Sequence, residues 1–122
     1  MAWIVPLADE FMAELRELRE PVQDELLAQG RLLAQFGPQL GRPRVDTLKG
    51  SRFSNMKELR FNADRGVWRV AFAFDAQRAA VVLAVGNKAG VPGARFYRDQ
   101  IRRADRRLAN HICRTGTAAT RD

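Results

Sequence analysis

Arginine, lysine and tyrosine side chains between residues 60 and 98 are the residues best suited to chemistry. A guanidinium group binds phosphate oxygens through two parallel N–H donors, whereas an ammonium group acts as a mobile point charge. Arginine carries protons poorly because its pKa exceeds about 12, so a lysine or tyrosine must move them. The candidates are Arg60, Arg69, Lys88, Arg95, Tyr97 and Arg98. Together these residue types indicate an anionic ligand.

Other familiar kinds of active site lack their residues. The chain has one histidine, His111, so no histidine pair can divide the work of base and acid. It has one cysteine, Cys113, which excludes an internal disulfide and a cysteine-rich metal site. The glycines at 86, 90 and 93 lack the pattern of a phosphate-binding loop. We expect neither a metal ion nor a cofactor.

Positive charge is unevenly distributed along the chain, whose net charge is +7. Residues 1–40 hold three arginines against seven acids, whereas residues 41–122 hold eighteen basic residues against seven acids. Concentrated positive charge attracts phosphate backbones through counterion release, so nucleic acid is the leading partner. The alternative is a high arginine content from biased codon usage.

Three apolar-alternating segments must position the candidate residues. Residues 55–61, 67–74 and 80–88 are separated by short polar breaks, which predicts an antiparallel meander. Because side chains alternate between the faces of a strand, Arg69 shares a face with small alanines, and the opposite face is apolar. We expect the apolar face to pack on helices and the alanine face to form a shallow trough with Arg69 at one end. Glu58 and Arg60 fall on the trough side.

Helical patterns precede and follow this meander. Residues 3–6 suit an edge strand or an arm, and residues 7–18 are helical with a solvated acidic face at Glu10, Glu14 and Glu17. A second helix begins near Pro21, or the two segments form one kinked helix. Residues 41–52 read as a connection. Residues 94–112 predict a last helix with an apolar line of Ile101, Ala104, Leu108 and Ile112, and with arginines on its other faces at 95, 98, 102, 103, 106 and 107.

The chain is expected to form one domain over residues 1–114, followed by a flexible tail at 115–122. No apolar run reaches the roughly 18 residues that a membrane span requires. Acidic residues interrupt the N-terminus early, which argues against a signal peptide. We therefore expect a cytoplasmic protein without a membrane partner.

Several runs of residues, taken together, resemble a known family over residues 7–112. The runs are Asp46–Ser51, Met56–Phe61, Gly66–Phe74, Gly86–Lys88 and Arg95–Tyr97. They closely resemble the HigB-type, phage-derived branch of the RelE toxin superfamily. The strand Gly-x-Trp-Arg-Val-x-Phe-x-Phe, followed by Gly-Asn-Lys and Phe-Tyr, is specific as a combination. The resemblance implies an α+β, RelE-like fold, in which an N-terminal helical hairpin packs on a small antiparallel sheet and a C-terminal helix follows.

The resemblance also implies a function. Members of this family are toxins of type II toxin–antitoxin pairs, which cleave messenger RNA in the ribosomal A site without a metal and so inhibit translation. Their partners are the ribosome and an antitoxin, often a helix-turn-helix protein. The other hypothesis is a non-catalytic RNA- or ribosome-binding protein on the same scaffold.

The family's functional residues can be carried over to matching positions. The catalytic candidates become Arg69 on the central strand, Lys88 after the last strand, Tyr97 near the substrate base and Arg60 on strand two. The RNA-binding candidates are Lys49, Arg52, Lys57, Arg95, Arg98 and Arg102.

Strand two departs from the family pattern. RelE has lysines on the solvent-facing side of this strand, whereas this chain has Met56 and Glu58, with Lys57 displaced by one position. A shift by one residue turns a strand side chain to the other face. The general base is therefore left open between Glu58 and Lys57.

Overall fold

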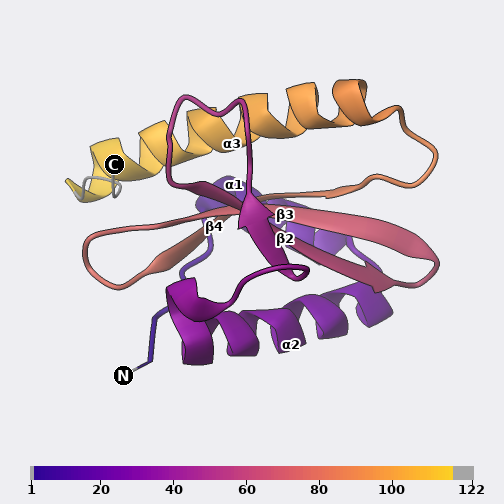
Figure 1. Ribbon diagram of the computed structural model, residues 1–122, viewed down its shortest axis with the longest axis horizontal. Coiled ribbons are helices and arrows are strands. Elements are labelled where there is room, and N and C mark those ends of the chain that lie inside the picture. Colours follow the sequence, from indigo (N-terminus) through magenta and orange to yellow (C-terminus); the bar gives the residue numbers. More distant parts are fainter. Residues whose placement is uncertain (1, 117–122) are drawn as a thin grey trace.

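A four-stranded antiparallel sheet lies between helices in the computed structural model, which describes residues 2–116 (Figure 1). The strands follow one another across the sheet in chain order. They are β1 (Val45–Thr47), β2 (Met56–Ala63), β3 (Gly66–Phe74) and β4 (Ala80–Asn87). The predicted meander and the α+β fold class are confirmed. The short strand β1 was not expected, because its three residues lie within the segment 41–52 that read as a connection.

The register of the sheet sets which side chains share a face. Arg60 lies opposite Arg69, and Glu58 lies opposite Ala71, across the β2–β3 pair. The predicted alternation is therefore confirmed for both strands. Lys57 lies opposite Phe72 and so belongs to the other face, as the one-residue displacement predicted.

Two separate helices precede the sheet, rather than one kinked helix. Helix α1 (Asp9–Glu17) ends where Leu18 and Arg19 adopt extended backbone, and α2 (Glu20–Phe36) begins with Pro21 in its first turn. Proline is tolerated there because its missing N–H has no helical partner at that position. Helix α2 ends at Gly37, whose φ of 53° favours glycine. A Cβ at this position would lie 2.3 Å from the indole nitrogen of Trp3, so Gly37 also makes room for the N-terminal segment.

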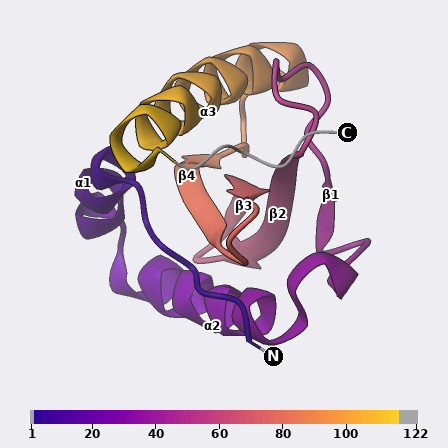
Figure 2. The ribbon, with the colours of Figure 1, turned by 90° about the vertical axis from the view of Figure 1, so that its left-hand side faces the viewer.

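Helices cover both faces of the sheet (Figure 2). Helices α1 and α2 bury the apolar face, and α3 (Gly93–Thr115) lies across the alanine face. The expected open trough is therefore wrong over most of its length. Ala71 and Ala73 are fully buried, as are Ala104 and Leu108 of α3. Small side chains on the sheet let a helix approach closely and fill the space.

An N-terminal arm, residues 3–8, extends the sheet beside β4. The N–H of Ala80 donates to the carbonyl of Ile4 (2.8 Å), and the N–H of Val82 donates to the carbonyl of Pro6 (2.9 Å). The bridges between the arm and residues 79 and 82 are parallel. The predicted arm is confirmed, and it covers the edge that β4 would otherwise expose.

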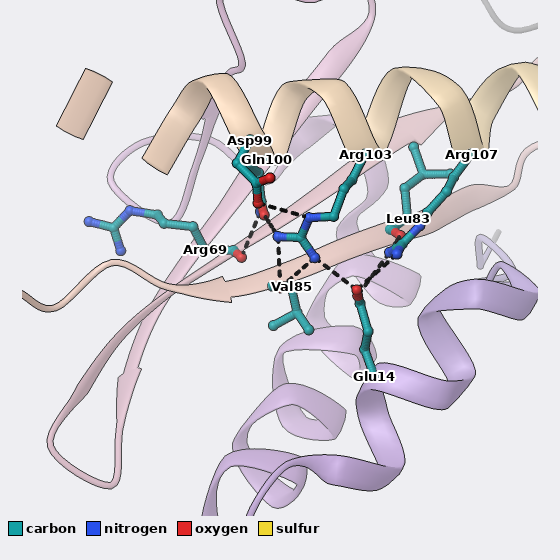
Figure 3. A network of polar contacts seen from close by, with 8 residues as sticks. All are labelled: Glu14, Arg69, Leu83, Val85, Asp99, Gln100, Arg103 and Arg107. Atoms are coloured by element: carbon teal, nitrogen blue, oxygen red, sulfur yellow. Dashed lines mark hydrogen bonds and ion pairs between the residues drawn. The ribbon is translucent and has the colours of Figure 1, made fainter. Parts of the chain in front are cut away.

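An ion-pair cluster made of Glu14, Arg103 and Arg107 joins α1 to α3, and Arg107 is its buried member (Figure 3). Both arginines donate to the Glu14 carboxylate at 2.8 Å, and Arg107 also donates to the Leu83 carbonyl at 2.9 Å. Burial alone would raise the pKa of Glu14, but its hydrogen bonds and charge interactions with Arg107 and Arg103 lower the pKa overall. Glu14, expected on a solvated face, is therefore 26% exposed and paired, and Arg107, expected on the arginine faces of the last helix, is buried.

The structure describes the expected C-terminal tail only in part. Helix α3 runs to Thr115, the first residue of the expected tail, and residues 117–122 of that tail lie outside the described part of the chain.

No helix within residues 2–116 is long and apolar enough to span a membrane. Over the same residues, no three histidine, cysteine or acidic side chains gather closely enough to hold a metal ion.

Candidate functional site

Five residues gather where β2, β3 and the start of α3 meet, and we call them the sheet-end cluster: Glu58, Arg60, Arg69, Lys88 and Tyr97. Glu58 lies at its centre and is buried, although it is a carboxylate. The Nε of Arg60 donates to Glu58 Oε2 at 3.0 Å, and the Nε of Arg69 lies 3.8 Å from Glu58 Oε1. Buried carboxylates are stable only when they are paired, and the two arginines supply that pairing.

Two hydrogen bonds fix Arg69, one through its side chain and one through its backbone. Its Nη1 donates to the Trp68 carbonyl at 3.0 Å, and its own carbonyl accepts from Gln100 of α3 at 3.0 Å. In Figure 3 its guanidinium extends away from the ion-pair cluster and past the first turns of α3. The side chain is 16% exposed, so its guanidinium is largely fixed but open at one end of the alanine face.

Two buried polar atoms in this cluster have no hydrogen-bond partner among the described residues. They are Arg69 Nε and Glu58 Oε1, which face each other at a distance too long for a hydrogen bond. Such atoms are rare in folded proteins and call for an explanation in each case. Here they leave donor and acceptor capacity in the middle of the cluster.

Arg60 lies between two carboxylates. Besides Glu58, its Nη2 lies 3.6 Å from Oδ2 of Asp46 on β1. Burial lowers the pKa of Arg60, but the hydrogen bond and charge of Glu58, with smaller contributions from Tyr97 and Asp46, raise it overall. Arg60 therefore remains a cation and cannot serve as a base.

Tyr97 and Lys88 complete the cluster from the far side. The Nζ of Lys88 lies 5.7 Å from the centre of the Tyr97 ring, a cation–π contact. Gly86 explains how the start of α3 comes so near β4, because a Cβ there would lie 2.8 Å from the ring of Phe96. Burial raises the pKa of Tyr97 most, and Glu58 raises it further, whereas Arg69 opposes the shift.

Replacing Glu58 by glutamine is expected to lower the pKa of Tyr97 toward its ordinary value of about 10 without restoring it fully, since burial remains. Tyr97 is the only tyrosine, so its ionisation can be followed by ultraviolet absorbance without interference from another phenol. A raised folded-state pKa contributes stability below the unfolded value, and this contribution is lost as pH rises through the folded value. An unchanged titration curve in the glutamine variant would show that Glu58 does not act on Tyr97.

The six RNA-binding candidates do not join this cluster. Lys57 lies on the opposite face, where its Nζ donates to the Thr47 hydroxyl at 3.2 Å. Lys49 and Arg52 are exposed in the connection between β1 and β2, where the Arg52 N–H donates to Asp105 of α3 at 3.1 Å. The remaining three, Arg95, Arg98 and Arg102, are exposed on α3 and line a surface groove of about 600 Å³ beside Asn87.

The structure adds two residues that the sequence analysis did not select. Asp46 pairs with Arg42 and Arg60, and Arg44 lies beside Arg60 in a groove next to the cluster. A backbone hydrogen bond from Thr47 lowers the pKa of Asp46 most, with help from Arg42 and Arg60. Both residues belong to the β1 region. The only sequence signal was the run of residues beginning at Asp46, because the strand itself is too short to show a periodicity.

Comparison with known proteins agrees with this architecture. A family model described as phage-derived protein Gp49-like matches residues 13–109. A Mycobacterium tuberculosis protein named "Putative toxin HigB2" is 41% identical over 105 residues, which are 85% of this chain and 52% of that protein. A second, named "Putative toxin HigB3", is 48% identical over 81 residues, 66% of this chain and 68% of that protein. The chain therefore spans about half the length of the first of these relatives.

A solved structure shows the same fold. The free state of a double arginine-to-alanine mutant of the E. coli toxin RelE matches with a TM-score of 0.57 and 15% identity, over 83% of this chain and 95% of that chain. At this identity the likeness concerns the fold alone. The resemblance to the HigB-type branch of the RelE superfamily, predicted from the sequence, is confirmed by the family model and the relatives together. The chain belongs to the Gp49-like family of phage-derived proteins.

Proposed function

We propose that this protein is the toxin of a type II toxin–antitoxin pair and acts as a metal-independent endonuclease on messenger RNA. The observation that carries the proposal is the sheet-end cluster, in which two arginines and a buried carboxylate meet within 3.0 and 3.8 Å. The names of the two relatives support the toxin role. In this proposal the protein acts in the cytoplasm on messenger RNA in the ribosomal A site, and a helix-turn-helix antitoxin silences it.

The chemistry needs no metal, because RNA carries its own nucleophile. The 2′-oxygen attacks the adjacent phosphorus and forms a new P–O bond, while the bond from phosphorus to the 5′-oxygen breaks. The products are a 2′,3′-cyclic phosphate and a 5′-hydroxyl. The protein must therefore position the phosphate, stabilise negative charge on its oxygens, take one proton and give one back.

Arg69 and Arg60 are suited to the charge on the phosphate. A fixed guanidinium offers two parallel donors to phosphate oxygens. Arg69 is held by Trp68 and Arg60 by Glu58, so each guanidinium loses little further freedom on binding. We assign both residues to the stabilisation of the transition state.

Glu58 is the general base in this proposal. It is the carboxylate of the cluster, whereas Lys57, the other candidate, points to the opposite face of the sheet. The proton for the leaving 5′-oxygen comes from Tyr97 or Lys88, which lie together on the far side of the cluster. The Tyr97 phenol is protonated at neutral pH, since its pKa lies above the ordinary value of about 10, and so it has a proton to give.

The direct test of the function is to induce the protein in bacteria and map RNA 5′ ends. New, discrete ends in messenger RNA that carry 5′-hydroxyl groups are expected, together with rapid arrest of translation. Translation arrest without new ends would favour the second candidate, a non-catalytic RNA- or ribosome-binding protein. One observation favours that candidate: the strand-two lysine is turned away from the cluster, and Glu58 already occupies the space between the arginines.

The exposed arginines of α3 are proposed to bind the RNA of the ribosome. Arg98 and Arg102 have no acidic partner among the described residues, in contrast to Arg103 and Arg107 of the same helix. Unpaired surface arginines gain most from phosphate because no internal ion pair must be broken.

Replacing Arg98 and Arg102 together by alanine is expected to weaken ribosome binding and to reduce its salt dependence. Each lost phosphate contact lowers the slope of log affinity against log salt by about 0.7 to 0.9. The measurement is co-sedimentation with purified ribosomes at several salt concentrations. The control removes the same charge from the N-terminal helices, at the exposed Arg16 and Arg31. Equal salt slopes for both double variants would contradict the assignment.

A further inference from the structure

A polar groove of about 550 Å³ adjoins the sheet-end cluster and shares Arg60 and Arg69 with it. Its other walls come from α2, the segment before β1, and the end of β2. They are Glu25, Gln29, Pro43, Arg44, Phe61 and Asn62. Pockets that hold small organic groups usually have volumes of about 300 to 1,000 Å³, so the groove has room for one nucleoside.

The groove exists because β1 is shorter than β2. The β1–β2 pairing runs from Val45 opposite Leu59 to Thr47 opposite Lys57, and the carbonyl of Arg44 accepts from the N–H of Arg60 as the last bond. Strand β2 continues to Ala63, so Asn62 lies beyond the end of its neighbour and is exposed. The edge of the sheet is therefore open beside Arg60.

The groups around this edge can bind a base as well as a phosphate. Among the described residues, the side chains of Asn62 and Arg44 make no hydrogen bond or ion pair, so both are available. Arginine can also stack on a base, and bases splayed out of a single strand are recognised in this way. A base held here would belong to a nucleotide whose phosphate reaches Arg60 and Arg69.

The α2 side of the groove offers mainly hydrogen-bond acceptors. Gln29 is 7% exposed, and its Nε2 donates to Oε2 of Glu25 at 2.8 Å, which orients that carboxylate. The Oε1 of Gln29 is buried and has no hydrogen-bond partner within residues 2–116. A carboxylate accepts hydrogen bonds and cannot donate them. A wall of this kind suits a base that carries an exocyclic amino group, and uracil carries none.

We propose that this groove is a base-reading subsite for one of the two nucleotides that flank the scissile phosphate. Glu25 and Asn62 bind the exocyclic amino group of adenine, cytosine or guanine, and uracil is disfavoured. Arg44 holds the phosphate or the base face on the outer side. The inference rests on the proposed endonuclease function and adds a sequence preference to it.

The test compares RNA 5′-end maps after induction of the wild-type protein and of two variants, Glu25→Gln and Asn62→Ala. The wild-type map should show uracil depleted at one position beside the cut. A well-made pair of hydrogen bonds to a base discriminates by about tenfold or more, so each variant should raise the uracil frequency at that position severalfold. The amide N–H introduced by Glu25→Gln can donate a hydrogen bond to a carbonyl oxygen of uracil.

The matched control is Gln35→Ala, which removes an exposed amide from the far end of α2. Its map should equal that of the wild type. Wild-type cleavage with the same base frequencies in both variants would overturn the subsite and leave the endonuclease intact. Absence of wild-type cleavage would overturn the endonuclease function, and the subsite with it.

Circular dichroism and thermal unfolding show whether the variants are folded. For a variant that is folded but cleaves RNA weakly, a binding measurement tests the proposal instead. A short RNA with a single 2′-deoxy nucleotide at the cleavage site cannot be cut and serves as the binding probe. Wild-type protein should bind the probe with adenine at the flanking position more tightly than the probe with uracil, and Asn62→Ala should reduce that ratio. Equal ratios in the two proteins would reject the proposal.

Discussion

Replacing Arg69 by alanine is expected to abolish growth arrest and to reduce the yield of new RNA 5′ ends by at least about 100-fold, the usual effect of losing one fixed donor to a transition state. The Arg69 guanidinium donates to the Trp68 carbonyl, and Gln100 fixes the Arg69 backbone carbonyl at the open end of the alanine face. Lysine at this position keeps the charge but loses the two parallel donors. We therefore expect Arg69→Lys to be nearly as inactive as Arg69→Ala.

The control for this prediction is Arg16→Ala, which removes an exposed arginine from α1, far from the cluster in sequence and on another element. It should retain full activity. Thermal unfolding of the Arg69 variants must show a cooperative transition, because Glu58 loses one of its two cationic neighbours. A folded Arg69→Ala protein with full toxicity would remove this residue from the mechanism.

Replacing Glu14 by glutamine is expected to lower the free energy of unfolding by about 3 kcal/mol, because a buried cation loses its counter-charge. The Arg107 side chain is only 7% exposed and would keep only neutral acceptors, the Leu83 carbonyl and the glutamine oxygen. For a domain of this size the loss corresponds to a fall of about 10 °C in Tm. Differential scanning calorimetry of the purified protein measures it.

Glu17→Gln on the same helix is the matched control, since Glu17 is exposed. It should leave Tm within about 1 °C of the wild type, as surface substitutions usually do. A Glu14→Gln protein as stable as that control would show that the ion-pair cluster does not join α1 to α3.

Glu14 also makes the stability of the protein sensitive to acid. The pKa of Glu14 is lowered in the folded state, so its stabilising contribution is present above the unfolded pKa of about 4.3 and is lost as pH falls through the folded value. The difference in urea stability between wild type and Glu14→Gln should therefore be full at pH 7 and should shrink below about pH 4. An unchanged difference in strong acid would contradict this origin.

Local periodicity was enough to predict the three members of the cluster that lie on the neighbouring strands β2 and β3. Alternation alone puts Glu58 and Arg60 on the face of Arg69, and the observed register agrees. The same alternation correctly predicted that Lys57 lies on the opposite face of the sheet. Lys88 and Tyr97 were selected by residue type and given roles by the resemblance, but no local pattern predicts which turn of a helix meets which strand end.

The errors have a common physical cause, which is that they depend on partners distant in the sequence. Arg103 and Arg107 were placed on the solvated side because arginine is usually exposed. No residue near them in the sequence indicates that they pair with Glu14. The alanine face was judged open because small side chains bury little area by themselves. It is closed by α3, whose approach those small side chains permit. Strand β1 was missed because three residues show no reliable periodicity.

The pairing of Glu14 with Arg107 spans 93 positions, and this has a consequence for the order of events during synthesis. The meander is made of neighbouring hairpins that can pair as soon as each strand leaves the ribosome, whereas Glu14 of α1 must wait for the arginines of the last helix. Chains are made at about 5 to 20 residues per second, so this wait lasts several seconds. Until then the nascent chain carries Arg60 and Arg69 without Tyr97, and the guanidinium groups of an incomplete protein lack the helix that would close the face beside them.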